Sequence, residues 1–94
     1  MIIKQYWIPV SERLPEEHDS KFKELKNTDK WKEKIMFESI SEEVIVTIKV
    51  SEEEIVDVAY TTDGEWGNDL LRWNKEAKVT AWMPLPEPYR EEQK

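Results

Sequence analysis

The sequence predicts an α+β fold in which one or two short helices cover a small antiparallel sheet of three to four strands. Residues 44–50 and 55–61 are rich in β-branched and aromatic side chains and flank a short acidic turn, which is typical of a β-hairpin. Residues 78–83 alternate between two faces and predict a further strand of the same sheet. Within residues 19–37, apolar side chains recur three or four positions apart, which indicates helices inserted before the hairpin.

The register of the hairpin follows from burial, because a one-residue slip exchanges the two faces of a strand. Val50 opposite Val56 lets the apolar rows of the two strands face each other. The neighbouring register would instead bring Asp57 to the apolar face. We therefore predict the first register, with a five-residue loop at 51–55.

The two inserted helices are predicted at residues 19–26 and 30–37. Asp19 or Ser20 is suited to cap the first helix, and Asp29 the second, because their side-chain oxygens accept hydrogen bonds from first-turn amides. Each helix is too short to be stable alone in water, so both need packing against the sheet.

Shorter elements complete the predicted fold. Residues 1–10 form a short strand that ends at Pro9, which has no N–H to donate to a ladder. Residues 65–67 add a brief strand, and residues 68–78 hold a helical turn. Residues 90–94 are charged, and we expect them to fray.

Large aromatic side chains in a domain of this size are first of all core material, since each removes about 150–250 Å² from water. We predict that Trp7 and Trp82 are buried, and that the proline-rich residues 84–88 fold back over Trp82. Asp57 is expected to face water. The acidic residues 52–54 lie at the hairpin tip, where their charge discourages association of sheet edges.

The composition describes one acidic domain spanning residues 1–94. The chain has no cysteine, which fits a reducing cytoplasm, and its first residues are too soon interrupted to form a signal peptide. No apolar run approaches the roughly 20 residues that a membrane span needs. With 21 acidic and 14 basic residues the net charge is -7, which disfavours direct nucleic-acid binding and favours a basic protein partner.

Two long segments near the ends of the chain carry a resemblance to a known family. They are Trp-Ile-Pro-Val-Ser-Glu-Arg-Leu-Pro-Glu at residues 7–16 and Val-Thr-Ala-Trp-Met-Pro-Leu-Pro-Glu-Pro at residues 79–88. With Gly-Glu-Trp at residues 64–66 between them, the chain resembles the domain of unknown function 551 family over about residues 7–89. The resemblance implies a small bacteriophage or prophage protein in the cytoplasm of a bacterial host, and it brings no mechanism. Residues 17–43 form an insertion where shorter members have a loop.

Residues with catalytic potential are few. His18 is the only histidine, and it lies beside Glu16, Glu17 and Asp19. We interpret it as an exposed loop residue, and the alternative is a general base or metal ligand in a small metal-dependent hydrolase. The two glycines do not form a phosphate-binding loop. We therefore assign no catalytic, metal-binding or cofactor-binding residue.

The candidate contact residues are Trp66, the flanking acidic residues Asp63 and Glu65, and Trp31 in the insertion. Tryptophan is enriched among residues that dominate the energy of protein–protein contacts, and the acidic neighbours suit a basic partner. We predict a non-catalytic protein-binding accessory module that acts on a host or phage protein. The alternatives are the hydrolase that uses His18, and a structural protein that forms oligomers through a sheet edge.

Overall fold

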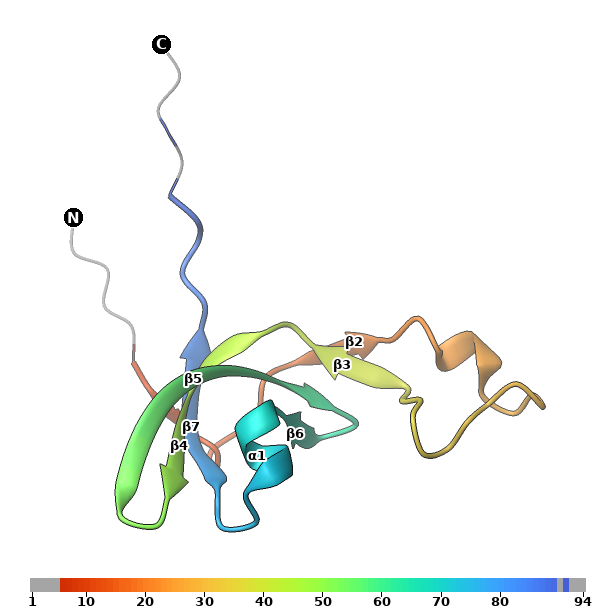
Figure 1. The fold of residues 1–94 in the computed structure, drawn as a ribbon. Coiled ribbons are helices and arrows are strands. Elements are labelled where there is room, and N and C mark those ends of the chain that lie inside the picture. The colour runs from red at the N-terminus through yellow and green to blue at the C-terminus, as the bar shows by residue number, and fades with distance from the viewer. Residues whose placement is uncertain (1–5, 90, 92–94) are drawn as a thin grey trace.

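The computed structural model describes residues 6–89 and 91, which form mainly antiparallel β-strands (Figure 1). The strands are β1 (Ile8–Pro9), β2 (Glu17–Asp19), β3 (Ser39–Ser41), β4 (Val44–Val50), β5 (Glu53–Thr62), β6 (Glu65–Gly67) and β7 (Lys78–Pro84). The helical elements are the 3₁₀ turn η1 (Lys23–Leu25) and the α-helix α1 (Asp69–Trp73). None of the described helices is long and apolar enough to cross a membrane.

One strongly curved sheet organises the molecule (Figure 1). Its strand order is β1-β7-β4-β5-β3-β2, and β6 pairs with the end of β5. The central strand β4 is paired with β5 on one side and with β7 on the other. The chain then runs through β6 and α1 before it returns along β7.

The predicted α+β fold class is wrong, because the structure is mostly β. Residues 19–26 and 30–37, which were predicted to be helical, contain only the three-residue η1. Asp19 lies in β2, opposite Ser39 of β3, so it does not cap a helix. Asn27 at φ 70° interrupts the segment. The segment also projects away from the sheet (Figure 1), so its apolar pairs lack the packing face that short helices require.

Most of the predicted strands are confirmed. Residues 44–50, 55–61 and 78–83 lie in β4, β5 and β7. β1 ends at Pro9 as predicted, while residues 1–5 of that predicted strand lie outside the described residues. β6 occupies the predicted brief strand, and α1 is the helical turn expected after it. The prediction for residues 90–94 falls outside the described residues except for position 91.

The predicted hairpin register is wrong. Val50 lies opposite Glu53 instead of Val56, so the connection is a turn of two residues. The first of these residues has φ 55°, which closes a tight turn without glycine. Burial does not select the register, because the second face of β5 is also apolar and remains exposed. Val56 and Val58 are 66% and 38% exposed, so apolar content does not distinguish the registers.

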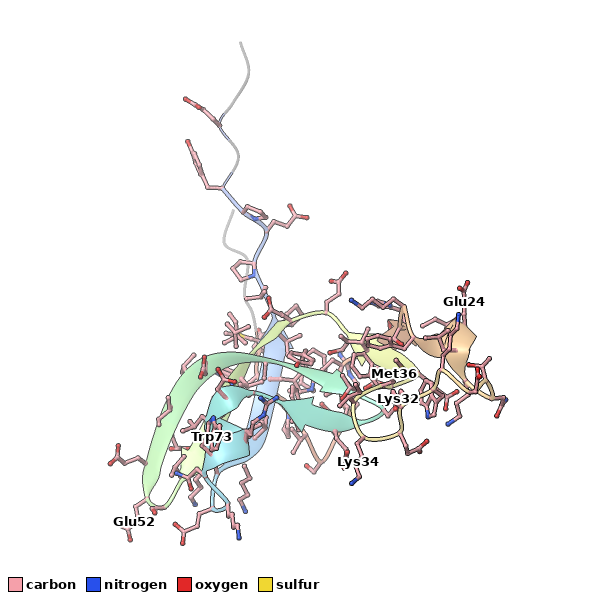
Figure 2. The ribbon with its side chains drawn as sticks, turned by 45° about the vertical axis from the view of Figure 1, so that its right-hand side comes forward. Glu24, Lys32, Lys34, Met36, Glu52 and Trp73 are labelled. Carbon is pink, nitrogen blue, oxygen red and sulfur yellow. The ribbon has the colours of Figure 1, made fainter. Side chains whose placement is uncertain are left out.

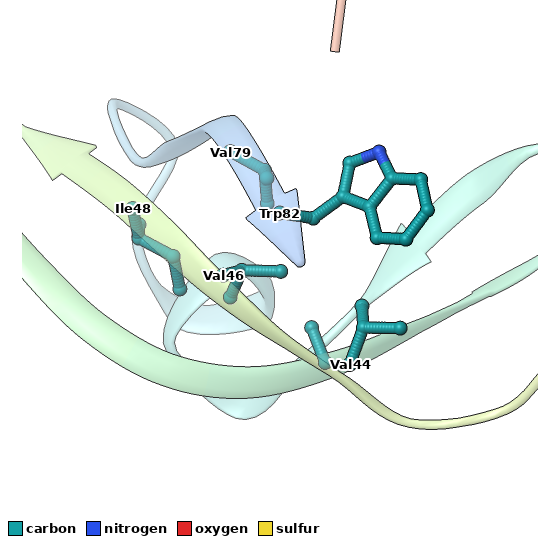
Figure 3. Close-up of a cluster of buried hydrophobic side chains, with 6 residues drawn as sticks. Val44, Val46, Ile48, Val79 and Trp82 are labelled. Atoms are coloured by element: carbon teal, nitrogen blue, oxygen red, sulfur yellow. The ribbon is translucent and has the colours of Figure 1, made fainter. Parts of the chain in front are cut away.

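The core lies on the inner, concave face of the sheet (Figure 3). Its buried hydrophobic members come from the three central strands: Val44, Val46, Ile48, Ala59, Val79 and Trp82. The burial of Trp82, which is 4% exposed, is confirmed. The predicted burial of Trp7 is wrong, because that side chain is 40% exposed. β1 pairs with β7 so that Ile8 lies opposite Trp82, and the Ile8 side chain therefore lies on the same inner face as Trp82. Trp7, the residue before it, is not on that face.

Trp82 is covered by the segment that follows β1. Its indole N–H donates a 2.8 Å hydrogen bond to the carbonyl oxygen of Arg13, and the Arg13 guanidinium lies 5.2 Å from the centroid of the indole ring. Pro15 of the same segment is buried. Pro84 ends β7, and residues 85–88 lead away from the sheet, so the proline-rich segment does not fold back over Trp82 as predicted (Figure 1).

Candidate functional site

Residues 20–38, which we call the arm, project from the sheet between β2 and β3 (Figure 1). A cleft of about 750 Å³ lies between the arm and the β5–β6–α1 region. Its apolar lining includes Phe37, Tyr60, Trp66 and Leu71. Its charged lining includes Glu33, Lys34, Asp63, Glu65 and Arg72. The cleft therefore combines aromatic surface with charges of both signs.

The turn between β5 and β6 attaches the arm to the sheet. Asp63 accepts hydrogen bonds from the backbone N–H groups of Glu38, at 3.2 Å, and Ser39, at 3.0 Å, through its carboxylate oxygen Oδ1. Its own backbone N–H donates to the Ser39 carbonyl oxygen at 3.1 Å. The next residue, Gly64, has φ 81° and donates its N–H to Glu17 Oε2 at 2.9 Å. The Asp63 carboxylate is thus engaged in holding one wall of the cleft.

Trp66 and Tyr60 line the cleft from two adjacent strands. Trp66 of β6 lies opposite Thr61, which is fully buried, and its half-buried ring packs against the core. Tyr60 lies opposite Gly67. A Cβ atom on Gly67 would come within 3.0 Å of the Tyr60 ring, so glycine at this position allows the ring to lie across β6.

Asn68 fixes α1 to the sheet beside the cleft. Its Oδ1 accepts a hydrogen bond from the Leu70 N–H at 2.7 Å, as an N-cap residue does. Its Nδ2 donates to the Val58 carbonyl oxygen of β5 at 2.7 Å. Since both halves of the amide are used, α1 is held in one orientation, with Leu71 and Arg72 lining the cleft.

The structure brings together three of the four predicted contact residues, since Trp66, Asp63 and Glu65 all line the cleft. Trp31 is not among the lining residues. Its indole N–H donates to Glu33 Oε2 at 2.6 Å, and Lys26 Nζ lies 4.7 Å from the centroid of its ring. Trp31 therefore packs within the arm.

His18 lines a separate hollow of about 430 Å³ together with Glu16, Glu17 and Glu42. The His18 Nδ1 lies 3.2 Å from the Asp19 carbonyl oxygen. Within the part of the chain that the structure describes, no group of three His, Cys, Asp or Glu side chains is placed to hold a metal ion. The hydrolase alternative stays a prediction from the sequence.

Sequence reasoning missed several residues at or near the cleft. Tyr60 and Arg72 line it, although neither was singled out. Trp73, at the end of α1, is 83% exposed. The polar residues that follow Trp73 are a signal of exposure, whereas the role of Tyr60 depends on its pairing with Gly67 across two strands.

Comparison with known proteins places these features in a family. A family model described as "Protein of unknown function (DUF551)" matches residues 6–89. No curated protein and no solved structure gives a significant match to the chain. The matched range includes both end segments that meet at Trp82, the arm, and every strand described above. The chain therefore belongs to the DUF551 family of proteins of unknown function.

Proposed function

We propose that this protein is a non-catalytic accessory module that binds a protein partner in the cleft between the arm and the β5–β6–α1 region. The observation that carries the proposal is the convergence of Phe37, Tyr60 and Trp66 from separate parts of the sequence in one charged-rimmed cleft. Aromatic side chains of this kind contribute large contact area at the centre of protein–protein interfaces, with polar groups around them.

The charge of the molecule supports a partner with a basic binding segment. Outside the arm, the sequence contains 17 acidic and eight basic residues. Glu65 is exposed at the rim of the cleft, and the Asp63 carboxylate beside it is occupied by backbone N–H groups. We therefore assign to Glu65 the contact with a basic side chain of the partner, while Tyr60 and Trp66 contact an apolar one.

The family resemblance supports the setting of this proposal. The end segments at residues 7–16 and 79–88 resemble a family whose members we expect in bacteriophages and prophages, so we propose a phage or host protein as the partner, in the cytoplasm of a bacterium. Opposite charges on two proteins increase the rate of encounter at low salt, whereas apolar contacts determine how long the complex lasts. The two contributions can be measured separately.

The experiment begins with capture of the partner from bacterial cells and continues with association and dissociation rates at low and high ionic strength. Glu65→Lys should weaken binding by roughly tenfold, or about 1.4 kcal/mol, because it places a positive charge against a basic segment. Glu12→Lys is the matched control, since Glu12 is exposed outside the cleft and the change in net charge is the same. Trp66→Phe should raise the dissociation rate while keeping an aromatic ring against the core.

Equal effects of Glu65→Lys and Glu12→Lys would contradict the proposed site, because only overall charge would then matter. An association rate that does not depend on salt would contradict the basic character of the partner.

A further inference from the structure

The two ends of the molecule carry opposite charge. The arm contains six lysines and four acidic residues, although the whole chain has a net charge of -7. The opposite end is the β4–β5 hairpin, whose tip carries Glu52, Glu53 and Glu54. Figure 2 shows Lys32 and Lys34 on the arm, far from Glu52 at the hairpin tip. The arm therefore cannot contact the hairpin tip of its own chain.

Much of the positive charge of the arm has no partner of opposite charge within the described chain. Among the described residues the ion pairs are Lys23–Asp19 at 3.0 Å and Lys26–Glu38 at 3.4 Å. Both ion pairs use lysines of the first half of the arm. Lys30, Lys32 and Lys34 take part in neither, and all three are exposed.

β5 presents an open edge next to the acidic tip. β4 pairs with one side of β5 along residues 53–59. On the other side of β5, β6 pairs only with residues 60–62. Asn68 Nδ2 donates a hydrogen bond to the Val58 carbonyl oxygen on the same side. Within the described chain, residues 53–57 therefore have no strand on this side. The edge also exposes apolar surface, since Val56 is 66% exposed and Ile55 is 37% exposed.

We propose that two copies of the chain associate reciprocally, with the arm of each copy docked on the open β5 edge of the other. Lys30, Lys32 and Lys34 are exposed at or beside a turn in which the Lys32 carbonyl oxygen accepts hydrogen bonds from the N–H groups of Ile35 and Met36. Ile35 is 71% exposed and provides apolar surface to meet that of β5. The lysines meet the acidic residues of the partner copy.

The reciprocal arrangement has two equivalent contacts and closes as a dimer with two-fold symmetry. The acidic tip opposes pairing between two identical β5 edges and favours a lysine-rich segment in their place. The docking segment overlaps one wall of the cleft, because Lys34 and Ile35 also line it, but the inference does not depend on the partner proposed for the cleft. The two surfaces that form the oligomer are the arm of one copy and the open β5 edge of the other.

Sedimentation velocity of the full chain tests the proposal. The wild type should be dimeric at low ionic strength and should shift toward monomer as salt screens the contacts. The arm variant Lys32→Glu/Lys34→Glu should be monomeric at the same concentration. Lys75→Glu/Lys78→Glu is the matched control, because it changes the net charge equally at the turn before β7 and at the first residue of β7. These positions lie beside the hairpin, where Ser51 Oγ donates a 3.3 Å hydrogen bond to Glu76 Oε2. This control should remain dimeric.

A charge exchange separates a docking contact from loss of folding. The hairpin variant Glu52→Lys/Glu53→Lys should also be monomeric alone. When it is mixed with the arm variant, both contacts of the mixed pair regain opposite charges, so a heterodimer should form. A wild type that is monomeric at low salt would overturn the proposal. So would an arm variant that remains dimeric, or a mixture of the two variants that remains monomeric.

Discussion

Trp82 and Arg13 are joined by a hydrogen bond from the indole N–H to the backbone carbonyl oxygen, at 2.8 Å and 69 residues apart in sequence. One residue belongs to the segment 7–16 and the other to the segment 79–88, which together carry the family resemblance. The two segments also pair through β1 and β7. Their unusual sequences thus meet in one structural unit, in which the first segment covers the buried ring of the second.

Replacement of Trp82 by alanine should therefore be strongly destabilising. We expect Trp82→Ala to lower the free energy of unfolding by about 3–5 kcal/mol, because it removes a buried aromatic side chain from a thin core. Trp82→Phe should cost less, roughly 1–2 kcal/mol, since it keeps most of the apolar volume and loses the hydrogen bond to Arg13. Denaturant unfolding of the three proteins measures both values. A midpoint for Trp82→Ala close to that of the wild type would contradict the burial of this ring.

Asp63 should stabilise the attachment of the arm. Asp63→Ala removes the acceptor for the N–H groups of Glu38 and Ser39, so we expect faster amide hydrogen exchange at both. The loss of stability should be modest, about 1 kcal/mol, because the site is exposed. Asp63→Asn is the control, because asparagine tolerates the φ of 48° and retains one acceptor oxygen. Unchanged exchange at Ser39 in Asp63→Ala would show that other contacts hold the arm.

Asn68 should be the main determinant of the orientation of α1. Asn68→Ala removes the N-cap and the bond to the Val58 carbonyl oxygen, and we expect a loss of about 1–2 kcal/mol in unfolding free energy. Asn68→Asp retains the cap oxygen but cannot donate to Val58, and it places a second carboxylate near Asp57. If the amide were important only as a cap, Asn68→Asp would be as stable as the wild type in denaturant unfolding.

Gly67 should control the position of the Tyr60 ring in the cleft. Gly67→Ala places a Cβ within 3.0 Å of that ring, so we expect the ring to move. The aromatic proton resonances of Tyr60 should shift, with a small loss of stability because the contact is at the mobile end of the side chain. Resonances that do not move would show that the ring does not lie across β6.

The central strands and the turn at α1 could be predicted because local sequence determines them. Residues 44–50 are rich in β-branched side chains, which favour a strand. Asn68 is of a residue type that is strongly preferred at helix N-caps. The three-residue strands β2 and β3 could not be found in this way. They exist because residues 17–19 meet residues 39–41, and neither stretch shows a strand pattern alone.

The predicted helices of the arm and the predicted hairpin register were both wrong because each depends on how distant parts of the chain pack. The apolar spacing within the arm favours helices only if a neighbouring surface buries it, and the arm projects beyond the sheet. The hairpin register could not be derived from burial, because Val56 and Val58 are apolar yet exposed. For the candidate site, Trp66, Asp63 and Glu65 were close in sequence and easily grouped. Tyr60 required knowledge of strand pairing.

Site-specific photo-cross-linking in bacterial cells tests the central claim, binding of a protein partner in the cleft, most directly. A photoreactive amino acid is placed at position 65, at the rim of the cleft, or at position 12, which is exposed outside it. A cross-link to a second copy is recognised by its mass and is scored separately. We predict that position 65 gives a discrete adduct with one other protein and that position 12 does not. An adduct that forms from position 12 and not from position 65, or equally from both, would contradict the assignment of the cleft.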